Sequence, residues 1–247
     1  MRKQFARLSY SFLLFLFLFA INACGDGSGE EKDIVTEPEK MNDRVKTNIT
    51  ELLSRIKDDG KADDSTTISR FKAVDAYYNQ SGYKAVWNSD EQFLSIADSM
   101  MLFVQQAKLY GLFPEDYHFT VLKNIAARFA ADTASVGDRR DAALWSKADV
   151  LLTDAFFHMA AHLHIGRLKV DSTFMNPDSV LTDKFYQSNL SAVVNGKSLS
   201  EVFHALEPSH EGYVELKKAT KQFIDSADFE KKYTYVSYPY KDSLAFV

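Results

Sequence analysis

Cysteine is almost absent from this sequence, since its 247 residues include one, Cys24. A single cysteine excludes an intrachain disulfide and a metal site built from several thiolates. Glycine and proline are scarce too, with 10 and 5 residues, which argues against an all-β fold that needs many turns. No dense run of Lys and Arg occurs and the formal net charge is -5, so no nucleic-acid partner is expected.

Apolar and aromatic side chains are what the sequence has in quantity. Hydrophobic residues make up 46% of the chain, and 13% of it is aromatic, with 19 Phe and 12 Tyr. Together with 26% charged residues, these proportions are ordinary for a folded globular protein. They are sufficient for a sizeable core.

The first 23 residues have the layout of a secretory signal peptide. Three basic residues precede "SFLLFLFLFAINA", an uncharged run that is shorter than the roughly 20 residues of a membrane span. The run ends in "INAC", which resembles a bacterial lipobox, where the thiol is diacylated and becomes the new N-terminus. We therefore expect residues 1–23 to be a lipoprotein signal peptide and Cys24 to be the lipid attachment site. The protein would be anchored in the cell envelope, facing the periplasm or associated with the outer membrane.

The stretch after Cys24, "GDGSGEEKDIVTEPEK", is polar and acidic. Residues 24–41 are predicted to be a flexible tether that holds the folded domain off the membrane. The same stretch also resembles the surface-export signals of some bacterial lipoproteins. Both interpretations stay open at this point.

From Asn42 onward, apolar residues recur at the spacings of three and four that are typical of amphipathic helices. No sustained strand alternation and no internal repeat is found. We predict a mainly α fold, with a single domain of about seven helices over residues 42–230. The longest periodic segment is 138–166, and residues 167–179 have no clear period and are predicted to be a loop.

Individual helix ends are also predicted. Gly82 is a favourable C-terminal residue for the helix that precedes it. Pro114 and the two acids after it predict the start of one continuous helix over 113–132. Ser209 is the predicted N-cap of the last helix.

The segment "DAFFHMAAHLHIGR" carries the most conspicuous chemistry. Asp154, His158 and His162 are spaced by four residues, so a helix brings them to neighbouring positions along one ridge. Two histidines at this spacing bind zinc in some proteins, and a carboxylate is a possible third ligand. A metal-binding lipoprotein is therefore one hypothesis for the chain.

The alternative is the end of an ordinary packed helix. An apolar stripe from Leu144 to Met159 places Asp154 near its polar edge, with His158 at the margin and His162 inside the stripe. His164 then points the opposite way. His162 and His164 would satisfy the last free carbonyls of the helix. The Glu of an HExxH metalloprotease is missing, so we favour the structural interpretation, with no metal, cofactor or catalytic residue.

A third hypothesis is a helical interaction module that docks a partner near Trp87 and Tyr117. Both are large aromatic residues that occur within the apolar pattern. The competing interpretation, which we favour, is that both belong to the core.

Four segments resemble the N-terminal scaffold domain of the large murein L,D-transpeptidases. They are "ISRFKAVDAYYNQSGYKAVW", "AKLYGLFPEDYH", "ADVLLTDAFFHMAAHLHIGRL" and "ALEPSHEGYVELKKA". They occur in the family's order, and the resemblance covers about residues 45–229. It implies a helical scaffold over 42–230, with 231–247 as a linker and the start of a peptidoglycan-binding domain.

The same resemblance implies a role in peptidoglycan cross-linking without catalysis by this chain. Family members use a cysteine nucleophile and a histidine in a motif of the form HG…SxGC, which this sequence does not contain. Cys24 is the expected lipidation site and does not match that motif. The expected partners are peptidoglycan or the catalytic and binding domains of the enzyme, and the expected chain is a truncated product or a fragment.

Overall fold

The computed structural model describes residues 32–56, 60–62, 66–90, 92–134, 140–168, 181–228 and 230–232. This part of the chain is mainly α, as predicted, and contains eight α-helices. They are α2 (Met41–Arg55), α3 (Phe71–Ser81), α4 (Ser95–Gln105), α5 (Phe119–Ala134), α6 (Ala142–Ile165), α7 (Asp183–Val194), α8 (Leu199–Leu206) and α9 (Glu211–Ser226).

Short 3-10 helices and strands complete the described fold. The 3-10 helices are η2 (Pro38–Lys40), η3 (Ala107–Tyr110) and η4 (Pro114–Tyr117). Strand β1 (Ile34–Val35) pairs antiparallel with β4 (Arg140–Asp141), and β2 (Asn88–Ser89) pairs antiparallel with β3 (Gln92–Phe93). Each strand has only two residues, which is too short to produce a sustained alternation of apolar and polar residues in the sequence.

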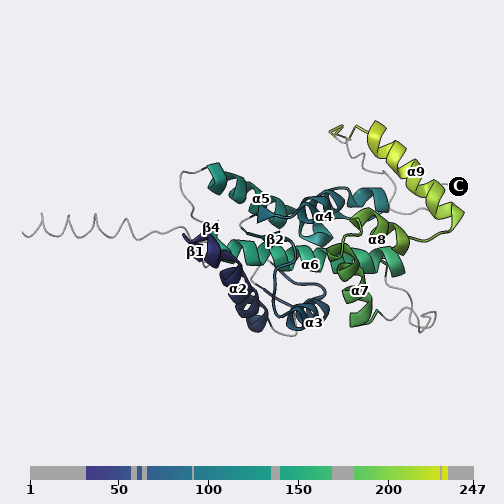
Figure 1. Cartoon of the computed structure of the whole chain (residues 1–247). Coiled ribbons are helices and arrows are strands. Elements are labelled where there is room, and N and C mark those ends of the chain that lie inside the picture. Colours follow the sequence, from purple (N-terminus) through teal and green to yellow (C-terminus); the bar gives the residue numbers. More distant parts are fainter. Residues whose placement is uncertain are drawn as a thin grey trace, which may run out of the picture.

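Helix α6 is the axis of the domain. Its 24 residues span roughly 36 Å at the usual rise per residue. It runs along the molecule, with α2 and α3 on one side and α4 and α5 on the other (Figure 1). Eighteen of its residues are buried, so α6 has apolar or buried side chains almost all round. The prediction that Asp154 lies near a polar edge of this helix is therefore wrong, because its side chain is fully buried.

The segment before α2 belongs to the folded domain. Asp33 accepts hydrogen bonds from Arg44 at 2.6 and 2.9 Å and from Asn48 at 2.8 Å. Val35 is buried and lies in the strand that pairs with β4. The predicted tether of residues 24–41 is therefore too long at its domain end. The signal peptide and Cys24 lie outside the described residues, as do positions 233–247 of the predicted linker.

Two helix boundaries differ from prediction, and one agrees. Gly82 adopts a left-handed conformation with φ of 67° and ends α3 as expected. The predicted single helix over 113–132 is broken at His118, whose φ is 61°, so η4 and α5 are separate. The N-cap of α9 is His210, whose Nδ1 accepts the N–H of Gly212 at 3.0 Å, and not Ser209.

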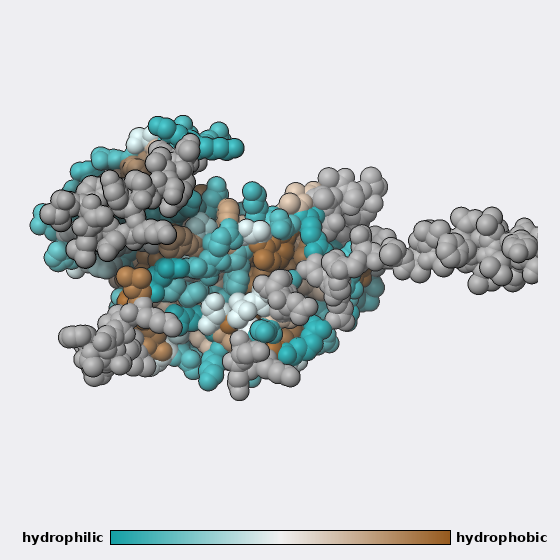
Figure 2. All heavy atoms as spheres, turned by 180° about the vertical axis from the view of Figure 1, so that it is seen from behind, coloured by the Kyte–Doolittle hydropathy of each residue, from teal (hydrophilic) through white to brown (hydrophobic). Residues whose placement is uncertain are grey.

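Trp87 and Tyr117 are both fully buried, which confirms the core interpretation over the docking one. The view from behind shows hydrophobic residues in separate patches between hydrophilic ones (Figure 2). Among the helices described, none has the length and apolar character needed to cross a membrane. Most of the predicted loop of residues 167–179 lies outside the described part.

Candidate functional site

Asp149 is the centre of a buried polar network on α6. Its carboxylate accepts hydrogen bonds from the Tyr78 hydroxyl at 2.5 Å, from the backbone N–H of Trp87 at 2.8 Å and from Asn88 Nδ2 at 2.7 Å. One turn further along, Thr153 Oγ1 accepts the indole N–H of Trp87 at 2.9 Å. The network joins α6 to the chain that follows α3.

Burial and hydrogen bonding act in opposite directions on this carboxyl. Removal from water raises the pKa of Asp149 to about 6, against the lowering effect of its hydrogen-bond donors. At pH 7 the group is therefore mostly ionised, the state that accepts hydrogen bonds from all of its neighbours. Its role is to hold the segment around Trp87 in place, because every side it presents is occupied by a protein donor.

Asp154 fixes a second junction. Its carboxylate accepts the backbone N–H groups of Ser69 and Arg70 at 3.0 and 2.6 Å, just before α3 begins. The Nε2 of His118 lies 2.7 Å from Oδ2 of Asp154. One fully buried side chain of α6 thus orders the start of α3 and also the turn between η4 and α5.

The two neighbouring histidines contact the same η4 segment. His158 Nδ1 lies 3.1 Å from the carbonyl oxygen of Asp116, and His162 Nδ1 lies 2.8 Å from the Tyr117 hydroxyl. Their rings are 4.2 Å apart between centroids. Burial lowers the pKa of His158, and burial followed by the nearby His158 lowers the pKa of His162 to about 4. In both histidines burial thus favours the neutral ring.

These contacts replace the expected helix-end role of His162. The side chain bonds to Tyr117 and not to a carbonyl of α6, whose last turn is instead closed by the N–H of Gly166 bonding to the His162 carbonyl oxygen. Within the described residues, no group of three or more His, Cys, Asp or Glu side chains is placed to hold a metal ion. Asp154, His158 and His162 each serve a different partner.

Two further groups of polar contacts involve the segment that follows α6 and helix α9. Arg167 Nε lies 2.6 Å from Oδ2 of Asp116, so the second residue after α6 also contacts η4. At the other end, Glu207 accepts hydrogen bonds from the Tyr213 hydroxyl at 2.8 Å and from Lys217 Nζ at 2.6 Å. Lys217 Nζ lies 4.2 Å from the centroid of the Tyr110 ring in η3.

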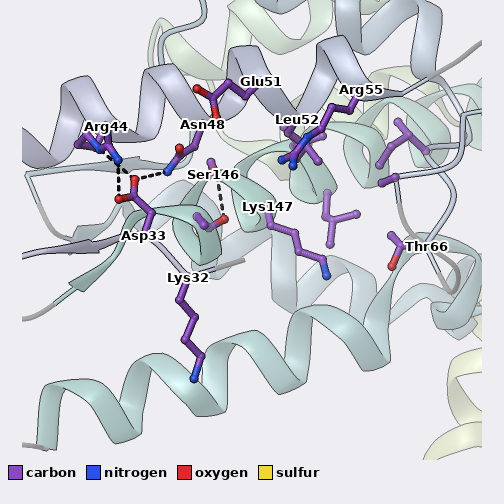
Figure 3. A pocket seen from close by; sticks show the side chains of 15 residues that line it. Lys32, Asp33, Arg44, Asn48, Glu51, Leu52, Arg55, Thr66, Ser146 and Lys147 are labelled. Carbon is purple, nitrogen blue, oxygen red and sulfur yellow. Dashed lines mark hydrogen bonds and ion pairs between the residues drawn. The ribbon is translucent and has the colours of Figure 1, made fainter. Parts of the chain in front are cut away.

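A pocket of about 380 Å³ opens between α2, α6 and the residues around Thr66 (Figure 3). Its lining combines charged side chains, such as Glu51 and Lys147, with apolar ones, such as Leu52 and Val150. Asp33 is turned toward Arg44 and Asn48, and its hydrogen bond to Arg44 lowers the pKa of the Asp33 carboxyl. The Ser146 hydroxyl donates to the Ala143 carbonyl oxygen of its own helix at 2.8 Å, so it is not presented as a nucleophile.

A family model described as Scaffold domain matches residues 72–219, more than half of the chain. The chain belongs to the Scaffold domain family. No curated protein and no solved structure gives a significant match. The match begins in α3 and ends in α9, so it includes the Asp149 network and Asp154 itself, whereas Ser69 and Arg70, which bond to Asp154, lie just before it.

Sequence reasoning singled out Asp154, His158 and His162 but missed their partners. It also missed Asp149, which lies five residues earlier and is fully buried. A carboxylate within the apolar run "ADVLLTDAFF" was the available signal, because an acid in a buried helix needs donors from neighbouring segments. The identity of those donors depends on tertiary structure.

Proposed function

We propose that this scaffold domain is the non-catalytic portion of a cell-envelope murein L,D-transpeptidase and serves peptidoglycan cross-linking. Membership of the Scaffold domain family supports the coarse role. The finer role is supported by the four segments that resemble the transpeptidase scaffold. A basic and apolar leader that ends at Cys24 supports placement in the envelope through a lipid anchor.

The observation that carries this proposal is that each of the four segments contacts at least one of the others. Tyr78 and Trp87 of the first bond to α6, which is the third. Tyr117 of the second also bonds to α6. Lys217 of the fourth lies over the ring of Tyr110 in the second. Residues that resemble one family's pattern thus make the contacts that define this fold.

The scaffold itself would position other groups and perform no acyl transfer. The sequence contains one cysteine, at position 24, and a transpeptidase of the resembled type needs a thiolate beside a histidine. The catalytic cysteine would therefore be supplied by a domain outside these 247 residues. Metal binding has no comparable support, because the three candidate ligands already contact protein groups.

Deletion of the gene, together with any in-frame coding sequence downstream, tests the envelope role. We expect fewer peptidoglycan cross-links between two diaminopimelate residues, measured by mass spectrometry of muropeptides. Wild-type complementation should restore them, and a Cys24→Ala version should restore them poorly while failing to incorporate labelled palmitate. An unchanged muropeptide profile in the deletion strain would overturn the proposal.

A second assay tests the absence of catalysis. The full-length chain in detergent is incubated with a disaccharide tetrapeptide, and no cross-linked dimer is expected. Dimer formation that survives Cys24→Ala would show a catalytic group elsewhere in the chain. That result would contradict a purely scaffolding role.

A further inference from the structure

The chain is fastened to the folded domain at Asp33 by several independent contacts. The Asp33 carboxylate accepts hydrogen bonds from Arg44 at 2.6 and 2.9 Å and from Asn48 at 2.8 Å (Figure 3). Its backbone N–H donates to Oδ1 of Asp141 at 3.1 Å, and its carbonyl oxygen accepts the N–H of Ala142 at 2.8 Å. Asp33 is therefore bound both to the first half of α2 and to the start of α6.

The two residues that follow Asp33 add to this fastening. Ile34 and Val35 form β1, which pairs with β4 directly before α6, and Val35 is buried. A pair of such short strands has little stability of its own, so the bonds of the Asp33 side chain and the burial of Val35 help to hold it. The contacts of Asp33 and β1 with α2, β4 and α6 are called the entry clamp below.

The entry clamp limits the length of chain between the domain and the expected lipid. Asp33 lies nine positions after Cys24, and a fully extended chain of this length spans about 30 Å at most. Without the clamp, the chain from Cys24 to the start of α2 at Met41 could span roughly 60 Å. The clamp thus halves the distance that the tether can reach.

The entry clamp and α9 lie toward opposite ends of the domain (Figure 1). Strands β1 and β4 lie beside the start of α6, and this helix runs for roughly 36 Å away from them. Helix α9 packs against η3, where Lys217 Nζ lies 4.2 Å from the centroid of the Tyr110 ring. A tether fastened at the clamp therefore ties one end of the domain to the lipid and leaves the α9 end free.

The charge of the chain disfavours a domain that lies flat on an anionic membrane. The formal net charge is -5, although the leader before Cys24 contributes three basic residues and no acidic one. The part from Cys24 onward is therefore more acidic than the whole chain, and anionic headgroups repel it. A body tethered by one end to a surface that repels it keeps its free end away from that surface.

We propose that the scaffold domain is a spacer on the membrane, in which the entry clamp holds the start of α6 close to the lipid surface and α9 lies away from it. This inference rests on the lipid anchor of the proposed function. It adds which end of the domain faces the membrane and which contacts set the distance.

Fluorescence energy transfer to acceptor-labelled lipids compares the two heights. Cys24 is the only cysteine of the chain and acylation consumes its thiol, so an introduced cysteine is the single labelling site. The full chain with Lys46→Cys in α2 or Lys221→Cys in α9, both exposed positions, is isolated from membranes, labelled and placed in vesicles of phosphatidylcholine and phosphatidylglycerol. Transfer from position 46 should be about twice that from position 221 or more, because the heights differ by roughly the length of α6.

Opening the entry clamp tests its part in setting the distance. The double variant Asp33→Ala, Val35→Ser removes the carboxylate bonds and the buried apolar side chain. Transfer from the label at position 46 should fall, because the tether becomes longer. Hydrogen exchange of the Ala142 amide, which bonds to Asp33, should become about tenfold faster or more.

Glu37→Ala is the matched control for the clamp variant. Glu37 belongs to the same segment, and its pair with Lys40 is exposed on both sides, so transfer and exchange should stay unchanged. Circular dichroism checks that the helices persist. If the double variant loses them, Asp33→Ala alone decides, because it keeps the buried Val35.

Incorporation of labelled palmitate, measured in the same preparations, separates the possible failures. Absence of palmitate would overturn the lipid anchor of the proposed function together with this inference. With palmitate present, equal transfer from both positions would overturn the spacer alone, and so would greater transfer from position 221, because α9 would then lie on the membrane. Unchanged transfer and exchange in a folded clamp variant would overturn the role of the entry clamp.

Discussion

The carboxylate of Asp149 accepts the backbone N–H of Trp87 at 2.8 Å, and both residues are fully buried. The same carboxylate bonds to Tyr78 in α3 and to Asn88 in β2. One side chain of the central helix therefore fixes the path of the chain from the end of α3 to the β2–β3 hairpin. The fold relies here on a polar anchor inside the core and not on apolar packing alone.

Asp149→Ala is expected to lower the free energy of unfolding by about 3–5 kcal/mol, because it leaves several buried donors without an acceptor. Thr153→Val should cost less, about 1–2 kcal/mol, since it removes the acceptor for one indole N–H. Urea unfolding followed by circular dichroism measures both. A loss below about 1 kcal/mol for Asp149→Ala would contradict the anchoring role.

The second prediction concerns pH and His162. The unfolded histidine has a pKa near 6.5, whereas burial lowers the pKa in the folded state to about 4. The unfolded state thus binds more protons between these values, so the stability contributed by the neutral ring falls as the pH falls from about 6.5 to about 4. Allowing for partial exposure of the ring, we expect a loss of about 1–2 kcal/mol.

His162→Gln isolates this effect, because glutamine does not titrate and still offers an acceptor to Tyr117. The difference in unfolding free energy between wild type and variant, measured in urea at pH 7 and pH 4.5, should shift in favour of the variant at the lower pH. Parallel stability curves would show that His162 does not titrate differently on folding.

The third prediction separates backbone and side-chain roles at His118. This residue has a φ of 61°, which costs a non-glycine residue about 1 kcal/mol, and its ring lies 2.7 Å from Asp154. His118→Ala should lower the unfolding free energy by about 2–3 kcal/mol, because Asp154 loses a buried partner. His118→Gly should cost about 1 kcal/mol less than alanine, since glycine relieves the backbone.

Thermal or urea unfolding of the two variants provides the comparison. A glycine variant as stable as the wild type would mean that the His118 ring contributes nothing. Equal losses for alanine and glycine would instead mean that the left-handed conformation carries no cost at this position.

Helical periodicity predicted the fold class because every α-helix here carries its own three- and four-residue spacing. It did not predict the break at His118, because the apolar pattern continues across that residue and the left-handed turn is held by Asp154, 36 positions away. Nor did it identify α6 as the central helix. An apolar stripe can be assigned to a helix from its sequence alone. Burial of that helix on all sides depends on how many other helices pack around it, which its own sequence does not show.

The site was predicted in part for the same reason. Spacing correctly grouped Asp154, His158 and His162 on one ridge of α6. Their partners come from residues 69–70 and 116–118, and sequence spacing carries no information about which distant loop covers a ridge.

The last prediction concerns the attachment of α9, which has no buried residue. The Glu207 side chain is 5% exposed and lies 2.6 Å from Nζ of Lys217, whose side chain is 31% exposed, so this ion pair is a partly buried polar contact that holds the helix. Glu207→Ala should increase hydrogen exchange across residues 211–226 by about tenfold or more, while exchange in α6 stays unchanged, because a weakly packed helix opens locally. Lys221→Ala is the matched control, since its pair with Asp225 is about 60% exposed on both sides and such pairs contribute little. Unchanged hydrogen exchange of α9 in the Glu207→Ala variant would show that contacts other than those of Glu207 hold this helix.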